Sequence, residues 1–190
     1  MSLTYATLAT LMNQPYSGYD IAKQFGSSVG FFWQATHQQI YRELIKLQEH
    51  GWVNVETIPQ EGRPNKKLYS LTRLGRQKIT EWIAQPCNPH PTKNELMVKL
   101  FVGYLVDPHI LVTELERHRQ LHRDNLSVYQ DFEQQYLQDL QQVSLDTKWQ
   151  YLTIRYGICY ETSWLAWCEE AIKELLTVPI DSRHLSKHHP

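Results

Sequence analysis

The sequence predicts a mainly α-helical protein with one small β-hairpin, in which the hairpin belongs to the N-terminal part and long helices form the rest. Apolar residues recur at helical spacing through most of the 190 residues. Two β-prone runs flank a loop rich in Gly, Pro and Asn at residues 59–66. Three prolines between Gln85 and Pro91 indicate a stiff linker. We therefore expect domains at 1–84 and 92–178, a linker at 85–91 and a loose tail at 179–190.

The first two predicted helices are short. Ser2 can cap a helix over Leu3–Asn13, and Pro15 lies just beyond its end. A second helix starts at Ser17, and its core-facing residues are expected to be Tyr19, Ile21, Ala22 and Phe25.

The third predicted helix has a clear beginning, buried side and end. Thr36 and Gln39 fit the capping-box pattern, in which each side chain bonds to the other residue's backbone N–H. Gly51 is placed to end the helix. The apolar stripe is Ile40, Leu44 and Leu47. At about 100° per residue, the opposite face carries Gln38, Arg42, Lys46 and Glu49.

A hairpin with a basic tip follows this helix directly. Its predicted strands are 52–58 and 67–72, and the tip carries Arg63, Lys66 and Lys67. A helix over Thr72–Ala84 closes the N-terminal part, with Leu74, Ile79, Trp82 and Ile83 expected inward. A polar-faced helix that can read bases, beside a basic hairpin that can hold phosphate, is the layout of a winged helix-turn-helix. DNA binding is therefore the leading interpretation.

The C-terminal part is expected to contain three helices. Thr92 and Glu95 match a capping box for a helix to about Leu105. Asp107 and Pro108 open a helix that could reach Val143, and Asp146 can cap another that runs to about Thr177. In the middle helix a 4-3 spacing predicts a seam that needs a partner surface, most simply a second copy of the chain. The predicted dimerisation residues are Leu111, Leu115, Tyr129, Phe132, Tyr136 and Trp167.

Charge and composition are those of a globular protein with a mildly basic head. Residues 1–84 carry nine Lys and Arg against six Asp and Glu, whereas residues 85–190 carry ten against fourteen. This split suits a DNA-binding head on an acidic body. No apolar run approaches the roughly 20 residues of a membrane span, and export is not expected because the N-terminus lacks a charged region followed by an apolar one. Three scattered cysteines favour neither disulfides nor a metal site, so a cytoplasmic location is expected.

Eight side chains are the candidates for contact with double-stranded DNA. Gln can bridge adenine and Arg can bridge guanine, so Gln38 and Arg42 are expected at base edges. The basic hairpin tip would hold phosphate and set salt dependence. A solvated helix face and an ordinary charged hairpin are the competing interpretations, and Tyr41 suits core packing as well as phosphate contact. The full set is Gln38, Gln39, Tyr41, Arg42, Lys46, Arg63, Lys66 and Lys67.

Aromatic and histidine residues of the last two helices raise further possibilities. An aromatic face at helical spacing is usually core or interface, but it could also line a pocket for a small aromatic effector. The effector candidates are Trp149, Tyr156, Tyr160 and Trp164. His118 and His122 have the spacing of a metal pair, yet no acidic residue or Cys is obviously placed to complete a site, so a role in dimer register is favoured. No cofactor is expected.

The chain contains none of the short catalytic motifs that would indicate an enzyme. Two alternatives to a DNA-binding regulator stay open at this point. One is a winged-helix adapter that binds other proteins, and the other is an aromatic-binding helical protein without DNA activity.

Several segments resemble the PadR-type transcriptional regulators. The matching segments are Ser-Gly-Tyr-Asp-Ile-Ala-Lys at 17–23, Phe-Trp at 32–33, Gln-Ile-Tyr-Arg-Glu-Leu at 39–44, Leu-x-x-x-Gly-Trp-Val at 47–53 and Tyr-Ser-Leu-Thr-x-x-Gly at 69–75. Residues 95–103 and the helices after them resemble the helical C-terminal domain of the family's longer members. The resemblance implies a homodimeric winged-helix protein, usually a repressor, which binds a palindromic operator and in several members is released by a small aromatic effector.

Overall fold

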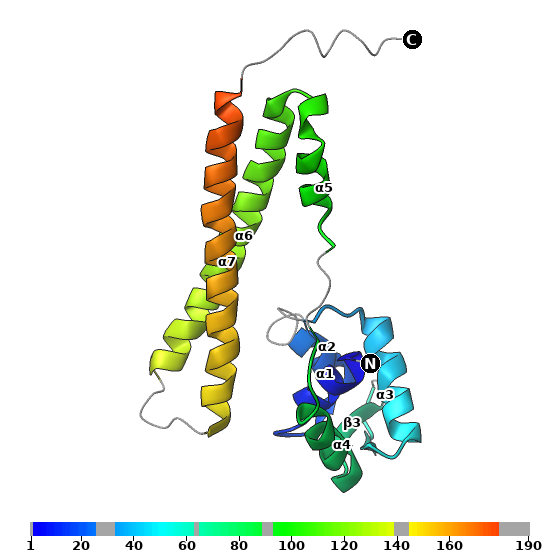
Figure 1. Ribbon diagram of the computed structural model, residues 1–190. Helices are drawn as coiled ribbons and strands as arrows, with labels where there is room; N and C mark the ends of the chain where they lie inside the picture. Colours follow the sequence, from blue (N-terminus) through cyan, green and yellow to red (C-terminus); the bar gives the residue numbers. More distant parts are fainter. Residues whose placement is uncertain (1, 26–32, 63–64, 89–92, 139–144, 179–190) are drawn as a thin grey trace, which may run out of the picture. The chain divides into compact units, whose positions relative to one another are not determined.

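The computed structural model describes residues 2–25, 33–62, 65–88, 93–138 and 145–178 (Figure 1). The chain divides into two compact units, Met1–His90 and Pro91–Pro190. The predicted fold class, mainly helical with a small antiparallel sheet, is confirmed. The N-terminal unit contains α1 (Ser2–Thr10), β1 (Tyr16–Ser17), α2 (Gly18–Phe25), α3 (His37–Glu49), β2 (Val53–Ile58), β3 (Lys66–Leu71) and α4 (Arg73–Ile83).

One hydrophobic core holds the N-terminal unit together. The predicted stripe of α3 lies at its centre, because Ile40, Leu44 and Leu47 are almost completely buried. Burying three such side chains stabilises the unit by roughly 1.5–3 kcal/mol each. The other buried members come from α1, α2, the sheet and α4, and they are Leu8, Leu11, Ile21, Ala22, Phe25, Val53, Tyr69 and Ile79.

Both ends of α3 follow the prediction from the sequence. The Gln39 backbone N–H donates to the Thr36 hydroxyl (3.3 Å), and the Thr36 N–H donates to the Gln39 side chain (2.8 Å). At the other end Gly51 has a φ of 70°. The N–H groups of Gly51 and Trp52 bond to the carbonyls of Gln48 and Leu47, each at 2.9 Å, which is a Schellman motif. The polar face of α3 is therefore fixed at both ends.

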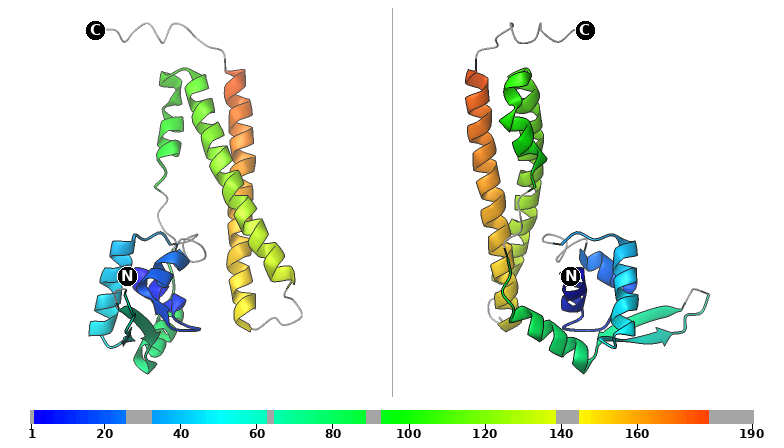
Figure 2. Two further views of the ribbon diagram at one scale, coloured as in Figure 1. Left: turned by 180° about the vertical axis from the view of Figure 1, so that it is seen from behind. Right: turned by 45° about the vertical axis from the view of Figure 1, so that its right-hand side comes forward.

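The predicted hairpin forms, with one additional strand. Strands β2 and β3 pair antiparallel from Val53 opposite Leu71 to Ile58 opposite Lys66. Strand β1, which the sequence analysis did not predict, pairs with the other edge of β3, giving the order β1-β3-β2. Figure 2 shows the hairpin extending away from the helices of its unit, as a wing does.

Some predicted core residues of the N-terminal unit are exposed. Tyr19 is 65% exposed, because Ile21, Ala22 and Phe25 define the buried side of α2 and Tyr19 lies to one side of it. Leu74 and Ile83 on α4 are also exposed, whereas Ile79 is buried as predicted. The remaining candidate, Trp82, is partly exposed and stacks on Tyr5 of α1 at a ring distance of 4.5 Å. The first helix ends at Thr10 rather than Asn13.

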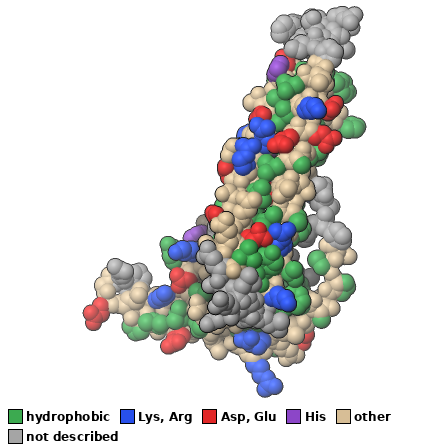
Figure 3. Space-filling model, turned by 90° about the vertical axis from the view of Figure 1, so that its left-hand side faces the viewer, with side chains coloured by type: hydrophobic (Ala, Val, Ile, Leu, Met, Phe, Trp, Pro, Cys, Tyr) green, Lys and Arg blue, Asp and Glu red, His purple; other side chains and the backbone are tan. Residues whose placement is uncertain are grey.

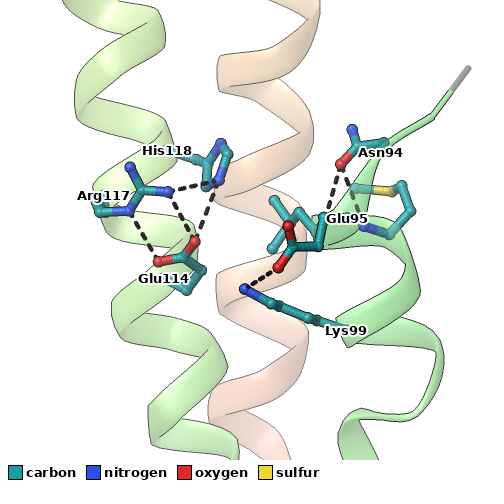
Figure 4. Close-up of polar contacts among 8 residues, drawn as sticks. Asn94, Glu95, Lys99, Glu114, Arg117 and His118 are labelled. Atoms are coloured by element: carbon teal, nitrogen blue, oxygen red, sulfur yellow. Dashed lines mark hydrogen bonds and ion pairs between the residues drawn. The ribbon is translucent and has the colours of Figure 1, made fainter.

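The C-terminal unit begins with a cap that differs from the prediction. Asn94 caps α5 (Glu95–Phe101), since its side chain accepts from the N–H groups of Leu96 and Met97, as Figure 4 shows. The expected capping residue, Thr92, lies outside the described residues. The predicted helix to Leu105 stops at Phe101, and a short 3-10 helix, η2 (Gly103–Leu105), follows.

Two long helices make up most of the C-terminal unit: α6 (Pro108–Gln138) and α7 (Leu145–Thr177). Asp107 caps α6 as predicted, by accepting from the His109 N–H at 2.8 Å. The predicted cap of α7 is wrong, because α7 already begins at Leu145 and Asp146 therefore lies within its first turn rather than at the N-cap position.

The predicted seam of α6 packs against α7 of the same chain. Leu111, Leu115 and Tyr129 are buried within this unit. The Tyr129 ring lies where a Cβ on Gly157 would come within 2.3 Å, so the two helices approach closely there. Tyr136 stacks on Tyr151 at 4.4 Å. The inference that this seam needs a second copy of the chain was therefore wrong, because α7 already covers it.

Candidate nucleic-acid interface

The outer face of α3 carries polar side chains that the fold does not use. Gln38 and Arg42 are both exposed. Neither side chain forms a hydrogen bond or ion pair with another residue that the structure describes. Lys46 is also exposed, and its ammonium lies 3.7 Å from the Glu43 carboxylate one turn earlier, a pair of little energetic weight at a surface. Gln38 and Arg42 can therefore bind a ligand without breaking a contact with another described residue, and Lys46 can do so by giving up a weak surface pair.

Two other predicted contact residues of α3 have structural roles as well. The carbonyl oxygen of the Gln39 side chain is bonded in the capping box, which leaves its amide N–H groups as donors. Tyr41 is partly exposed, and its ring covers Gly18 at the start of α2, where an added Cβ would meet the ring at 2.5 Å. Tyr41 therefore lies at the edge of the unit, in contact with α2.

The two lysines of β3 in the wing differ in whether they form an ion pair. Lys67 is exposed and makes no ion pair or hydrogen bond within the described part of the chain. Lys66 lies 3.3 Å from a carboxylate oxygen of Asp20 on α2, and each of the two side chains is about two-fifths exposed. Arg63 lies outside the described residues, so its place at the tip stays a prediction. Among the described residues, Lys67 of β3 is thus unpaired and Lys66 is paired with Asp20.

Asp20 belongs to a small network that the sequence analysis did not identify. It accepts from the Ser17 hydroxyl at 2.6 Å and from the Ser17 N–H at 3.4 Å, while its own N–H donates to the Ser17 hydroxyl at 3.2 Å. The hydrogen bond from Ser17 is the main cause that lowers the pKa of Asp20 from 3.8, and Lys66 adds to it. The spacing of Ser17 and Asp20, which matches a capping box, is the signal that could have revealed this network.

The aromatic residues of α7 do not share one environment. Trp149 and Tyr156 are about two-thirds exposed, and Tyr160 is nearly half exposed. Trp164 is partly buried and stacks on His122 of α6 at 4.5 Å, and Trp167 packs edge-on against Trp164 at 5.1 Å. The four effector candidates therefore run from the surface into the α6–α7 contact.

A buried carboxylate completes the polar middle of the α6–α7 contact. Glu161 is only 5% exposed, and it lies 2.5 Å from Nδ1 of His122 and 3.5 Å from the side-chain amide of Asn125. His118 lies one turn earlier, near the Glu114 carboxylate that Arg117 holds with two bonds (Figure 4). Among the described residues no cluster of three or more His, Cys, Asp or Glu side chains is placed to hold a metal ion.

Glu161 was missed although the sequence contains a signal for it. The buried positions of α7 include Gly157, Cys168 and Ile172, and Glu161 falls among them, four residues after Gly157 and seven before Cys168. A charged residue within an apolar stripe requires a partner across the contact.

No helix of the described residues has the length and apolar character to span a membrane.

A capped helix with an unused polar face, beside a two-stranded basic wing, defines a winged-helix DNA-binding regulator of transcription. The model of the PadR-like family of transcriptional regulators matches residues 7–81. The model of the virulence activator alpha C-terminal domain matches residues 92–175. The chain belongs to the PadR-like family of transcriptional regulators.

Relatives and solved structures agree with this assignment. The chain is 34% identical to the probable transcriptional regulator Rv1176c of Mycobacterium tuberculosis, over 92% of this chain and 98% of that protein. It is 41% identical over 101 residues to the negative transcriptional regulator PadR of Bacillus subtilis, which is 52% of this chain and 55% of that protein.

Solved structures of B. subtilis PadR and of a Vibrio cholerae regulator share the fold. PadR in complex with operator DNA has a TM-score of 0.79 and 28% identity, covering 92% of this chain and 99% of the other. PadR in complex with p-coumaric acid has a TM-score of 0.73 and 25% identity, covering 93% and 96%. The V. cholerae virulence activator AphA has a TM-score of 0.73 and 30% identity, covering 92% and 98%.

Proposed function

We propose that this protein is a repressor that binds a palindromic operator as a homodimer. In this proposal residues 1–84 bind DNA, and residues 92–178 provide dimerisation and an effector site. Gln38 and Arg42 contact base edges, while Lys46, Lys67 and Arg63 contact phosphate, with Gln39, Tyr41 and Lys66 at the margin of the interface. The B. subtilis relative is a negative regulator, and this is the observation that supports repression.

The unused polar face of α3 is the observation that carries the proposal. Burial of Ile40, Leu44 and Leu47 fixes the rotation of α3, so Gln38 and Arg42 must point to solvent. In helix-turn-helix proteins the residues near the N-terminus of the recognition helix meet the base edges. Gln38 is the second residue of α3, and Arg42 follows one turn later.

Exposed apolar side chains on the C-terminal unit support a homodimer. Phe101 is 84% exposed and Tyr104 is 77% exposed. On α7, Trp149, Leu152 and Tyr156 are exposed at spacings of three and four residues. Figure 3 shows one face on which hydrophobic side chains lie between charged ones along the long helices. Large apolar side chains exposed at helical spacing suit a contact with another molecule, and we assign them to the second subunit in place of the covered α6 seam.

A small aromatic effector is the second part of the proposal. The B. subtilis structure with p-coumaric acid gives the chemical class. The aromatic side chains from Trp149 to Trp164 on α7 offer faces for a flat ring, and His122 and Glu161 lie beside Trp164 as polar groups. Such a ligand would release DNA only if it binds the DNA-incompetent arrangement more tightly.

Fluorescence anisotropy with DNA from upstream of the protein's own gene tests the proposal. We expect salt-dependent binding with preference over a scrambled duplex. Replacing Arg42 by Ala should weaken operator binding about 5- to 150-fold for each bound subunit, equivalent to about 1–3 kcal/mol for one base contact. Arg73→Ala, an exposed arginine on α4, is the matched control. Equal binding to both duplexes, or full binding by the Arg42 variant, would contradict the proposal. Adding p-coumaric acid to the same assay tests the effector.

A further inference from the structure

The two lysines of β3 differ in whether their charge is already compensated. Lys66 lies 3.3 Å from Asp20, whereas Lys67 next to it is exposed and unpaired within the described residues. The Asp20 carboxylate in turn accepts from the hydroxyl and from the backbone N–H of Ser17. Strand pairing brings the same elements together, because Ser17 lies opposite Leu68 in the β1–β3 ladder. The Asp20–Lys66 pair is therefore fixed by backbone pairing as well as by its own charge.

We infer that Asp20 limits the affinity of the wing for DNA by compensating the charge of Lys66. This inference rests on the proposed DNA-binding function and adds an affinity-limiting residue to it. A lysine raises affinity for DNA by replacing counterions at a phosphate. A lysine that already neutralises a carboxylate adds no net positive charge to the wing, so it replaces few counterions. Without Asp20, Lys66 becomes a full phosphate contact.

The inference predicts the salt dependence of binding quantitatively. Each neutralised phosphate contributes about 0.9 to the slope of log affinity against log salt. Asp20→Asn should therefore steepen the slope by about 0.9 for each bound subunit. Between 50 and 200 mM salt, this makes the loss of affinity about 3.5-fold greater per subunit. Because phosphate contacts carry no base information, the operator and a scrambled duplex should gain alike.

Four variants in the full chain test the inference by anisotropy at several salt concentrations. Asp20→Asn keeps an oxygen that can accept from Ser17, so the cap of α2 is retained, and circular dichroism checks the fold. Lys66→Met alone should change the slope by much less than 0.9. In the double variant, Asp20→Asn with Lys66→Met, the steeper slope caused by Asp20→Asn should disappear. Glu81→Gln is the control, because it removes the same charge from the Lys78–Glu81 pair on α4 (2.8 Å) and should leave the slope unchanged.

Three results would overturn the inference while leaving the proposed function intact. The first is an unchanged slope in Asp20→Asn, and the second is a slope that becomes shallower by about 0.9 in Lys66→Met. The third is a steeper slope that persists in the double variant. The last result would mean that Asp20 repels phosphate directly. Lys66→Met keeps the test decisive even if Asp20→Asn unfolds. Absence of salt-dependent binding by the wild-type protein would instead refute the proposed function, and the inference with it.

Discussion

Removing His122 should strongly destabilise the contact between α6 and α7. The carboxylate of Glu161 is buried on α7, where it lies 2.5 Å from His122 and 3.5 Å from Asn125. In His122→Ala the carboxylate loses its short bond from His122, while the 3.5 Å bond from Asn125 remains. The same change removes the ring that stacks on Trp164 at 4.5 Å.

The size of the effect follows from these two losses. A buried polar group left without its partner costs about 1–3 kcal/mol, and more if it is charged. The lost stacking adds about 0.5–1.5 kcal/mol. We therefore expect His122→Ala to lower the free energy of unfolding by about 2–4 kcal/mol. A double variant, His122→Ala with Glu161→Leu, should recover part of this loss, because no buried carboxylate is then left unpaired.

Urea unfolding followed by circular dichroism at fixed protein concentration measures these differences, since association would otherwise shift the apparent stability. His118→Ala is the matched control. This histidine lies one turn earlier, with its ring 6.2 Å from Trp164, but its carboxylate partner Glu114 keeps two bonds from Arg117. The control should cost less than about 1 kcal/mol. Equal losses in both single variants, or strictly additive losses in the double variant, would refute the reasoning about Glu161.

Three further predictions concern other contacts. Thr36→Ala removes the acceptor of the capping box at α3 and should cost about 1 kcal/mol in a thermal or urea unfolding measurement. Gly75→Ala should cost about 3 kcal/mol by the same measurement, because the new Cβ would lie 2.1 Å from the Trp52 carbonyl oxygen, which is backbone and cannot rotate away. Arg117→Ala should raise the pKa of Glu114 from about 2 towards 4.5, as followed by NMR titration of the carboxylate, because the bonds from Arg117 are the main cause of the lowered pKa. In the wild type this pair therefore stabilises the fold above about pH 4.5, and its contribution is lost as the pH falls towards 2.

Local features of the N-terminal unit could be predicted from the sequence. The cap at Thr36, the buried stripe of α3 and the end at Gly51 each depend on residues within one or two turns. The hairpin also followed from its turn-rich loop. The cap of α5 shows the limit of such reasoning, because Thr92 and Asn94 are both good capping residues two positions apart and the pattern alone does not choose between them.

Contacts between distant segments could not be predicted in the same way. The spacing of Leu111, Leu115 and Tyr129 showed that one face of α6 is buried, but periodicity does not say which helix covers it. The same limit applies to Glu161 and His122, which are 39 positions apart, and to Asp20 and Lys66. A pairing between single residues on different elements leaves no repeating signal along the chain.

A polar side chain that is already bonded within the fold is less available to bind DNA. In this respect α3 and the wing of the N-terminal unit differ. On α3 the fold uses the apolar stripe and the caps, which leaves Gln38 and Arg42 without a partner among the described residues. On the wing the fold uses Lys66, because its pair with Asp20 joins β3 to the start of α2. We therefore expect substitutions at Gln38 or Arg42 to change which bases are preferred, and substitutions at Asp20 to change affinity for every sequence alike. Measuring the ratio of operator to scrambled binding for Gln38→Ala and Asp20→Asn separates these two effects, and a changed ratio in Asp20→Asn would show that the wing also contributes to base preference.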